Sequence, residues 1–178
     1  MRSEDNTLIK QITVRDIELL QKLSVTTFTD TFAAYNTEED MRMYIEKYFS
    51  PENLQDELNN GDSFFFVAFY KDEPAGYLKL RIPQEHHQVL KNNSSIELER
   101  IYVLKQLQGT GLGYHLMQFA LDYSKQKGFD TLWLGVWERN EKAINFYKKC
   151  GFEIFGEHAF ILGTDTQNDL LMKKLLSN

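Results

Sequence analysis

The sequence predicts an α/β protein with a mixed sheet flanked by helices. Three observations lead to this prediction. The strand-like run 96–103 leads through a glycine-rich loop into a helix-like run, 112–127, and a second strand-like run, 132–136, leads into another helix. Two strand-like runs between residues 64 and 82 are spaced as a hairpin. No repeat, low-complexity stretch or Pro/Gly-rich linker divides the chain, so a single domain over 1–178 is expected.

The N-terminal third is predicted to hold one short strand followed by helices. Residues 8–12 read as a strand, and Thr13 to Asp16 form a variant capping box at the start of a helix. A second helix begins after Thr37. Ser50-Pro51 opens a short third helix, because proline is favoured at the first helical position.

The middle and the end of the chain are predicted to supply the rest of the sheet. Residues 64–70 and 75–82 form a hairpin joined by the polar residues 71–74. Residues 84–93, which include two histidines without metal-ligand partners at suitable spacing, read as an exposed loop. A pair of strands is expected from residue 152 onward.

The central strand carries a break in its apolar pattern. Ile96 and Leu98 keep the two-residue period of a strand, whereas Ile101 and Val103 resume it after a gap of three. This phase slip predicts a β-bulge between Leu98 and Ile101, which would splay the strand away from its neighbour. An ordinary bulge that binds water is the alternative interpretation.

The loop between the central strand and its helix is suited to phosphate. Its glycines at 109, 111 and 113 permit positive φ and remove the Cβ atoms that would keep a ligand from the backbone. The first amides of the following helix lack carbonyl partners and carry the positive end of the helix dipole. The spacing fits neither the dinucleotide fingerprint nor the P-loop. A tight turn without a ligand is the alternative.

Two motifs in this region resemble those of the GNAT (GCN5-related N-acetyltransferase) family. Gln108, Gly111 and Gly113 match the acetyl-CoA loop pattern Q/R-x-x-G-x-G/A, and residues 140–152 match N-x-x-A-x-x-F-Y-x-x-x-G-F, in the family's order. The amino-acid sequences of residues 97–103 and 133–138 further resemble those of the PaiA-type branch of bacterial polyamine acetyltransferases. The resemblance implies the GNAT fold, in which a mixed, mostly antiparallel central sheet is flanked by helices and carries a β-bulge in its central strand.

The resemblance also implies a set of site residues and acetyl-CoA as cosubstrate, with no metal. The implied acetyl-CoA contacts are Ile101, Tyr102, Val103, Gln108, Gly109, Thr110, Gly111, Leu112, Gly113, Tyr114, Asn140 and Phe146. Asn140 is equally a good helix N-cap. Tyr147 matches the tyrosine that protonates the leaving thiolate, and its alternative is a core tyrosine on the face of Ala143 and Cys150.

A base must also be present, because the nucleophile is an amine. An amine with a pKa near 10.4 is neutral in about one molecule in two to three thousand at pH 7, so presenting the free base costs roughly 4–5 kcal/mol. Glu97 and Glu99 stand two apart on the central strand and share a face unless the bulge intervenes. Glu99 is slightly favoured as the base. The alternative for either carboxylate is a solvated side chain or a salt bridge, for example to Arg100.

Composition limits the partners. A net charge of −6 and a pI near 5.3 argue against nucleic acid and suit a cationic substrate. The single cysteine, Cys150, excludes an internal disulfide and fits the reducing cytoplasm. No apolar run is long enough to span a bilayer, and no signal-peptide core begins the chain, so no membrane partner is expected.

The predicted function is acetyl transfer from acetyl-CoA to a primary amine by direct attack, with spermidine or spermine as the expected acceptor. Aromatic and acidic residues could line a channel for a polycation, or could be core aromatics beside a solvated acidic face: Phe28, Asp30, Phe32, Tyr35, Glu38, Glu39, Asp40, Trp137 and Glu138. Another small amine, a protein N-terminus, and a regulator that binds acetyl-CoA without turnover remain open. The chain is expected to be a monomer or a homodimer.

Overall fold

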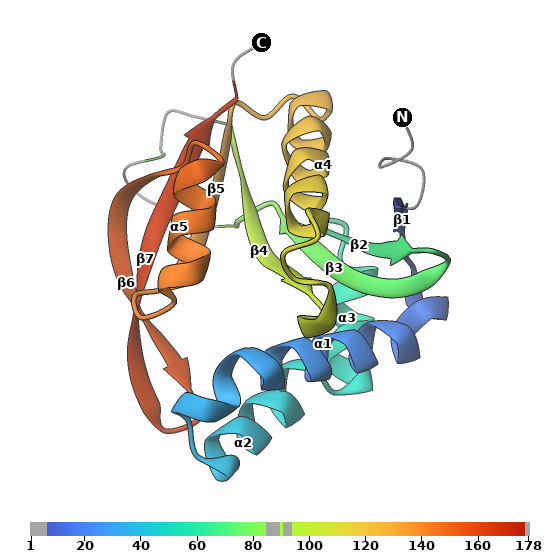
Figure 1. Ribbon diagram of the computed structural model, residues 1–178, viewed down its shortest axis with the longest axis vertical. Coiled ribbons are helices and arrows are strands. Elements are labelled where there is room, and N and C mark those ends of the chain that lie inside the picture. The colour runs from blue at the N-terminus through green and yellow to red at the C-terminus, as the bar shows by residue number, and fades with distance from the viewer. Residues whose placement is uncertain (1–6, 85–89, 91–93, 177–178) are drawn as a thin grey trace.

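The computed structural model describes residues 7–84, 90 and 94–176, and its elements follow the predicted order (Figure 1). The strands are β1 (Thr7–Gln11), β2 (Ser63–Tyr70), β3 (Glu73–Arg81), β4 (Ser95–Val103), β5 (Thr131–Trp137), β6 (Glu153–Leu162) and β7 (Asp165–Leu175). The helices are α1 (Ile17–Phe32), α2 (Glu38–Tyr48), α3 (Pro51–Asn59), α4 (Leu112–Gln126) and α5 (Glu141–Lys149). Short 3-10 turns lie at Val14–Asp16, Ala33–Tyr35 and Lys105–Leu107.

The strands form one mixed sheet in the order β1-β2-β3-β4-β5-β7-β6. The β4–β5 pair is parallel, and the other neighbouring pairs are antiparallel. The predicted fold class, an α/β protein with a mostly antiparallel sheet, is therefore confirmed.

The helix starts are set by the expected capping chemistry. Thr13 and Asp16 form the full capping box, in which each side chain accepts a hydrogen bond from the other's backbone. The side chain of Thr37 caps α2, and that of Ser50 caps α3 with Pro51 at the first position. Local sequence thus fixes where the N-terminal helices begin.

Two loop predictions were wrong in part. The hairpin turn is the pair Lys71-Asp72, with φ of 52° and 66°, while residues 73 and 74 belong to β3 because pairing with β2 continues to Tyr70. The predicted exposed loop 84–93 lies mostly outside the described residues, including both histidines. Leu90, which is described, is only 1% exposed because it packs against Trp133 and Leu171.

The β-bulge in the central strand is confirmed. Lys79 on β3 pairs with Arg100, and Leu80 pairs with Leu98, so Glu99 is the extra residue. Because of this extra residue, Arg100 pairs with Lys79 and projects from the same face of the sheet. In a regular strand it would project from the opposite face to Glu97 and Glu99.

The splay of the central strands is also confirmed. β4 and β5 pair over Ser95 to Glu97 and Thr131 to Trp133, whereas β5 from Leu134 to Trp137 pairs with β7 alone. The two strands diverge below that point, and α5 and α4 stand on either side of the divergence, with α1 below (Figure 1). We call the region between the diverging strands the opening.

Each face of the sheet has its own apolar core. The larger core joins α4 and α5 to one face, and the second joins α1, α2 and α3 to the other. The opening therefore lies where the two faces of the sheet carry differently composed cores.

Candidate active site

The glycine loop leaves the start of α4 free for a ligand. Gly109 and Gly111 have φ of 83° and 92°, and a Cβ at either would meet no atom within 4 Å. Gly111 is the N-cap residue, and no side chain caps the helix. The amides of the first turn therefore keep an unfilled hydrogen-bonding capacity and the positive end of the helix dipole, which suits phosphate.

Gly113 contributes differently from the prediction. It lies inside α4 and is absent from the glycines with positive φ. A Cβ there would lie 3.8 Å from the Phe146 ring, an ordinary van der Waals contact, so the start of α4 lies beside α5 but does not need a glycine for that approach. The two predicted motifs thus meet across the opening.

Lys142, a residue that the sequence did not single out, links the same two motifs. Its Nζ donates a hydrogen bond to Oε1 of Gln108 at 2.7 Å, and Nε2 of Gln108 donates to the Val103 carbonyl at 3.3 Å. An ammonium group therefore stands beside the glycine loop. Thr110 donates its hydroxyl to the Leu107 carbonyl at 2.7 Å, and Tyr114 is half exposed.

The helix α5 starts and ends as its sequence predicted. The Asn140 side chain accepts from the Ala143 amide at 3.2 Å, so its N-cap role is confirmed. Gly151 ends the helix with φ of 89°, and the Phe152 amide donates to the Tyr147 carbonyl. These ends fix the rotation of α5 and therefore the position of Tyr147.

Tyr147 belongs to the larger core and is 9% exposed. Its ring packs edge-on against Phe146, and burial raises the pKa of its hydroxyl well above the ordinary value, with Cys150 adding to the shift. Burial also raises the pKa of Tyr102 on β4, and Tyr147 contributes to that rise among the neighbouring tyrosines. Tyr147 is therefore a protonated side chain within electrostatic range of the splayed part of β4.

The opposite face of β4 carries a buried ion-pair network. Arg100 donates to both oxygens of Glu57 on α3, at 2.8 and 3.0 Å. Lys79 lies 3.2 Å from Glu57 and 2.9 Å from Glu99, and its side chain is 3% exposed. The predicted partnership of Arg100 with a strand glutamate is confirmed for Glu99, at 3.3 Å.

Glu97 and Glu99 share a face of the sheet, as the spacing predicted. Contacts from one side chain, Arg81, to both carboxylates show this. Its Nε lies 3.0 Å from Glu97 and 3.1 Å from Glu99. Burial raises the pKa of Glu97 despite the charge of Arg81. Burial also acts on Glu99, but Arg100, Lys79 and Arg81 outweigh it and lower the pKa of that carboxyl. Glu99 is thus held ionised by neighbouring cations, which makes it a weak base.

The aromatic and acidic residues predicted to line a channel have different roles in the structure: some are core or structural side chains, and others are exposed. Phe28 and Phe32 are buried in the second core. Asp40 accepts hydrogen bonds from the amide and hydroxyl of Thr164, which lower the pKa of its carboxyl. Its role is therefore to hold the β6–β7 turn against α2.

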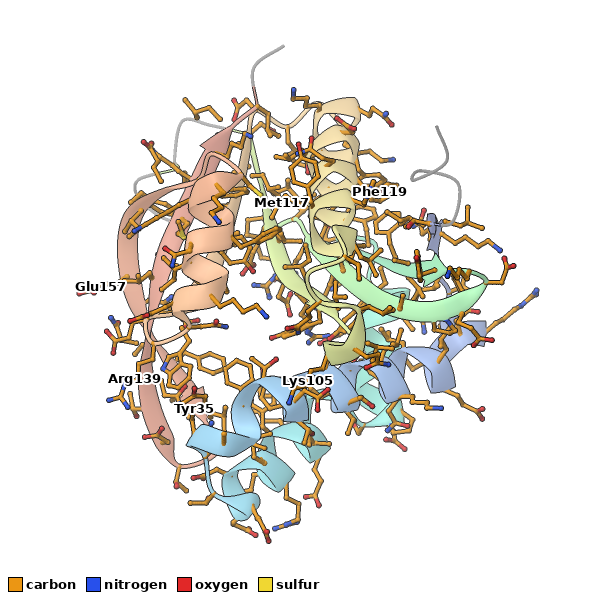
Figure 2. All side chains as sticks on the ribbon, viewed as in Figure 1. Tyr35, Lys105, Met117, Phe119, Arg139 and Glu157 are labelled. Carbon is orange, nitrogen blue, oxygen red and sulfur yellow. The ribbon has the colours of Figure 1, made fainter. Side chains whose placement is uncertain are left out.

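An aromatic pair lies at the other end of the predicted channel. Tyr35 is 65% exposed, and its ring centroid lies 5.1 Å from that of Trp137 on β5. Tyr35 ends the 3-10 turn that follows α1 and lies on the β6–β7 side of the molecule in Figure 2. It therefore extends the buried Trp137 surface to solvent.

The described part of the chain offers neither a metal cluster nor a membrane span. Within residues 7–84, 90 and 94–176, no group of three or more His, Cys, Asp or Glu side chains could hold a metal ion. In the same ranges, none of the helices combines the length and apolar character needed to cross a membrane.

Comparisons with known proteins agree with this geometry. Residues 25–152 match the acetyltransferase (GNAT) family. An uncharacterized N-acetyltransferase from Lactobacillus delbrueckii subsp. lactis is 40% identical over 168 residues, which cover 94% of this chain and 96% of that protein. A spermidine N(1)-acetyltransferase from Thermoplasma acidophilum is 27% identical over 150 residues, covering 82% of this chain and 88% of that protein.

A solved structure shares the fold over nearly its whole length. The PaiA N-acetyltransferase from Thermoplasma acidophilum, crystallised in complex with coenzyme A, is similar with a TM-score of 0.76 and 24% sequence identity. The match covers 95% of this chain and 98% of that chain.

Proposed function

The chain belongs to the GNAT family of acetyltransferases, and from that premise we propose that it transfers the acetyl group of acetyl-CoA to a primary amine of a polyamine such as spermidine or spermine. The observation that carries the proposal is the opening between β4 and β5, with the uncapped start of α4 on one side and Tyr147 on the other.

The chain's own residues fit the parts of acetyl-CoA, which supplies the acetyl group as a thioester. The diphosphate would lie on the amides at the start of α4, where Gly109 and Gly111 leave the backbone bare and Lys142 adds a positive charge. The pantetheine arm would follow Ile101 to Val103, whose β5 side has no strand partner among the described residues. Thr110, Leu112, Tyr114, Asn140 and Phe146 would line the same path.

The proposed reaction balances through two proton transfers. The acceptor enters as an ammonium ion, loses one proton to a base, and then forms a C–N bond with its free electron pair. The C–S bond breaks with its pair going to sulfur, and the second proton leaving nitrogen reaches the thiolate through the Tyr147 hydroxyl. Backbone N–H groups of the splayed strand would stabilise the negative charge that develops on the carbonyl oxygen.

The sequence-based candidates for the base are Glu97 and Glu99. The raised pKa of Glu97 makes it the better proton acceptor of the two near neutral pH, because Glu99 is neutralised by three cations. Arg81 contacts both carboxylates, however. Either glutamate would therefore have to weaken an ion pair in order to accept a proton.

Three features support a polyamine as the acceptor. The spermidine N(1)-acetyltransferase from Thermoplasma acidophilum is a relative over 82% of the chain. The net charge of −6 favours a polycation in general. The Tyr35–Trp137 pair provides an aromatic surface on which an alkylammonium chain can lie. Other small amines, a protein N-terminus and a regulator without turnover are the alternatives.

We also propose that residues 1–178 act as a single catalytic domain, as a monomer or a homodimer, in the cytoplasm. The free, buried Cys150 is consistent with a reducing compartment.

An acceptor screen tests the function. Purified protein and acetyl-CoA are mixed with polyamines, monoamines, amino acids, aminoglycosides and peptides, and release of the CoA thiol is measured. We expect the highest kcat/KM with spermidine or spermine. A monoamine that performs equally well would refute the polyamine assignment, and no release with any acceptor would favour the regulator. Tyr147→Phe is the matched control, expected to lower kcat by roughly 10²–10⁴ while it leaves acetyl-CoA binding intact.

A further inference from the structure

Asp169 of β7 lies beside the open part of β5, on the face of the sheet that α1 covers. It is the direct cross-strand partner of Trp137, and such partners project from the same face. The Trp137 ring packs against Phe32 and Tyr35, with centroids 6.0 and 5.1 Å away. At this level β5 is not paired with β4, because their pairing ends at Trp133. Asp169 therefore lies one strand away from the opening, beside the part of β5 that β4 does not pair with and on the face of the aromatic pair.

A glycine on β5 leaves room for the Asp169 carboxylate. A Cβ at Gly135 would lie 3.3 Å from Oδ2 of Asp169 and 3.7 Å from Cε1 of His158. Glycine weakens the interior of a strand and often marks a place where another group approaches closely. Here that group is a carboxylate, and any side chain at position 135 would crowd it.

The Asp169 carboxylate is also incompletely satisfied. Its Oδ1 is shielded from solvent and makes no hydrogen bond with the residues that the structure describes. Burial raises the pKa of Asp169 from 3.8 to about 6. A buried, ionised carboxylate oxygen without a donor is costly, so the group gains from any cation that reaches it.

The groups that face Asp169 can be named. His158 is its cross-strand partner on β6 and is the titratable side chain on that side. β5 presents Gly135 and Trp137, which do not titrate. Tyr35 stands beyond the Trp137 ring. None of these neighbours is a lysine or an arginine, in contrast to the three cations that surround Glu99.

We propose that the Asp169 carboxylate receives the ammonium group of the acceptor and takes one proton from it before attack. This inference rests on the proposed function and names the base of that reaction. As the N–H bond breaks, its electron pair stays on nitrogen and the proton forms an O–H bond at Asp169. The proton then passes to solvent, and the carboxylate is restored.

The position of Asp169 complements that of Tyr147. Tyr147 belongs to the core on the α4–α5 face, whereas Asp169 shares the face of Trp137, which belongs to the α1–α3 core. The base and the acid therefore stand on opposite faces of the sheet. In this arrangement the amine approaches from the α1 side, and the thiol leaves on the α4–α5 side.

Asp169→Asn tests the inference, because it removes the charge and preserves the shape. Glu157→Gln is the matched control, since it removes a carboxylate of β6 that faces the other side, where Glu157 accepts a hydrogen bond from Asn168 at 3.0 Å. We expect Asp169→Asn to lower kcat/KM for spermidine by roughly 10²–10⁴ and the control to leave it unchanged. Gly135→Ala should also lower it, because the added Cβ displaces the carboxylate.

Binding provides a readout that is independent of turnover. Calorimetry should show weaker spermidine binding to the Asp169→Asn protein saturated with coenzyme A, with unchanged affinity for acetyl-CoA. If wild-type protein turns over and Asp169→Asn matches it in kcat/KM and spermidine affinity, the role of Asp169 is refuted and the proposed function stands. If wild-type protein turns over no amine, the proposed function fails, and this inference fails with it.

Discussion

Two groups of ionisable side chains face the α1–α3 layer from either side of the opening, and their charges are compensated differently. On the β4 side, Glu99 lies within 3.3 Å of Lys79, Arg81 and Arg100. On the β7 side, Oδ1 of Asp169 has no hydrogen-bond partner in the described part of the chain. Oε2 of Glu99 also makes no hydrogen bond within the described ranges, but Lys79 and Arg81 lie 2.9 and 3.1 Å from it and compensate its charge. The pKa of Asp169 is shifted by burial alone, so an incoming ammonium would stabilise the Asp169 carboxylate more than it would Glu99. The first group stabilises the bulge against α3, and the second can meet a substrate.

The largest expected effect comes from breaking the compensated network. Arg100→Met keeps the length of a 7% exposed side chain but removes the cation between Glu57 and Glu99. Because both carboxylates would lose a buried partner, we expect the free energy of unfolding to fall by about 3–5 kcal/mol in urea titrations.

The control for that prediction is an ion pair at the surface. Glu153→Gln removes a contact of 4.0 Å to Lys173 from a side chain that is 72% exposed, and should cost roughly 0–1 kcal/mol. Equal losses in the two variants would contradict a stabilising role for the network.

Asp169→Asn should change the free energy of unfolding by a smaller amount than Arg100→Met, and should increase it. The folded state binds the Asp169 proton more tightly than the unfolded state, because the pKa rises from 3.8 to about 6. Folded wild-type protein therefore loses stability as pH rises from about 4 through about 6, and Asp169→Asn avoids that loss. Above that window the variant should be more stable by about 1–2 kcal/mol, a value reduced for partial solvent screening.

Urea unfolding on both sides of that pH window measures this difference. The gap between Asp169→Asn and wild type should close below about pH 4, where the carboxyl is protonated in both states. A variant that is less stable than wild type at neutral pH would mean that the Asp169 charge is satisfied within the protein.

The smallest expected effect concerns acceptor selectivity. If further ammonium groups of a polyamine meet exposed carboxylates near Tyr35, each contact is worth about 0.2–1 kcal/mol and is screened by salt. The advantage of spermine over a monoamine in kcat/KM should therefore shrink as salt is added. If the advantage of spermine in kcat/KM does not depend on salt, the enzyme would recognise the polyamine through apolar contacts alone.

The parts of the fold that depend on local chemistry could be predicted from the sequence. The caps at Thr13, Thr37 and Ser50 need only neighbouring residues, and the bulge follows from the phase of apolar side chains. The two-residue turn at Lys71-Asp72 could not, since positive φ is uncommon without glycine. The burial of Leu90 depends on distant partners such as Trp133.

The candidate site divides in the same way. The glycine loop and Tyr147 lie in contiguous motifs, which made them visible in the sequence. Asp169 lies in no motif, and its setting arises from its register with Trp137 and from the missing Cβ of Gly135 on another strand. The network around Glu99 likewise brings together α3, β3 and β4, so the sequence alone left Glu99 as a plausible base.

In the proposed mechanism, the carboxylates that are compensated by cations stabilise the fold, and Asp169 removes the proton from the acceptor amine. The most direct test is the pH dependence of kcat/KM for spermidine in wild type, Asp169→Asn and Glu99→Gln, with His158→Gln to account for the neighbouring imidazole. This profile reports the pKa of the base in the free enzyme. In wild type, Glu99→Gln and His158→Gln, kcat/KM should decrease below about pH 6, which is the pKa of Asp169. Above that pH, kcat/KM should be constant in these three proteins. Asp169→Asn should instead rise steadily with pH, because it depends on free amine from solution. A break near pH 6 that survives in Asp169→Asn and disappears in Glu99→Gln or His158→Gln would contradict the account.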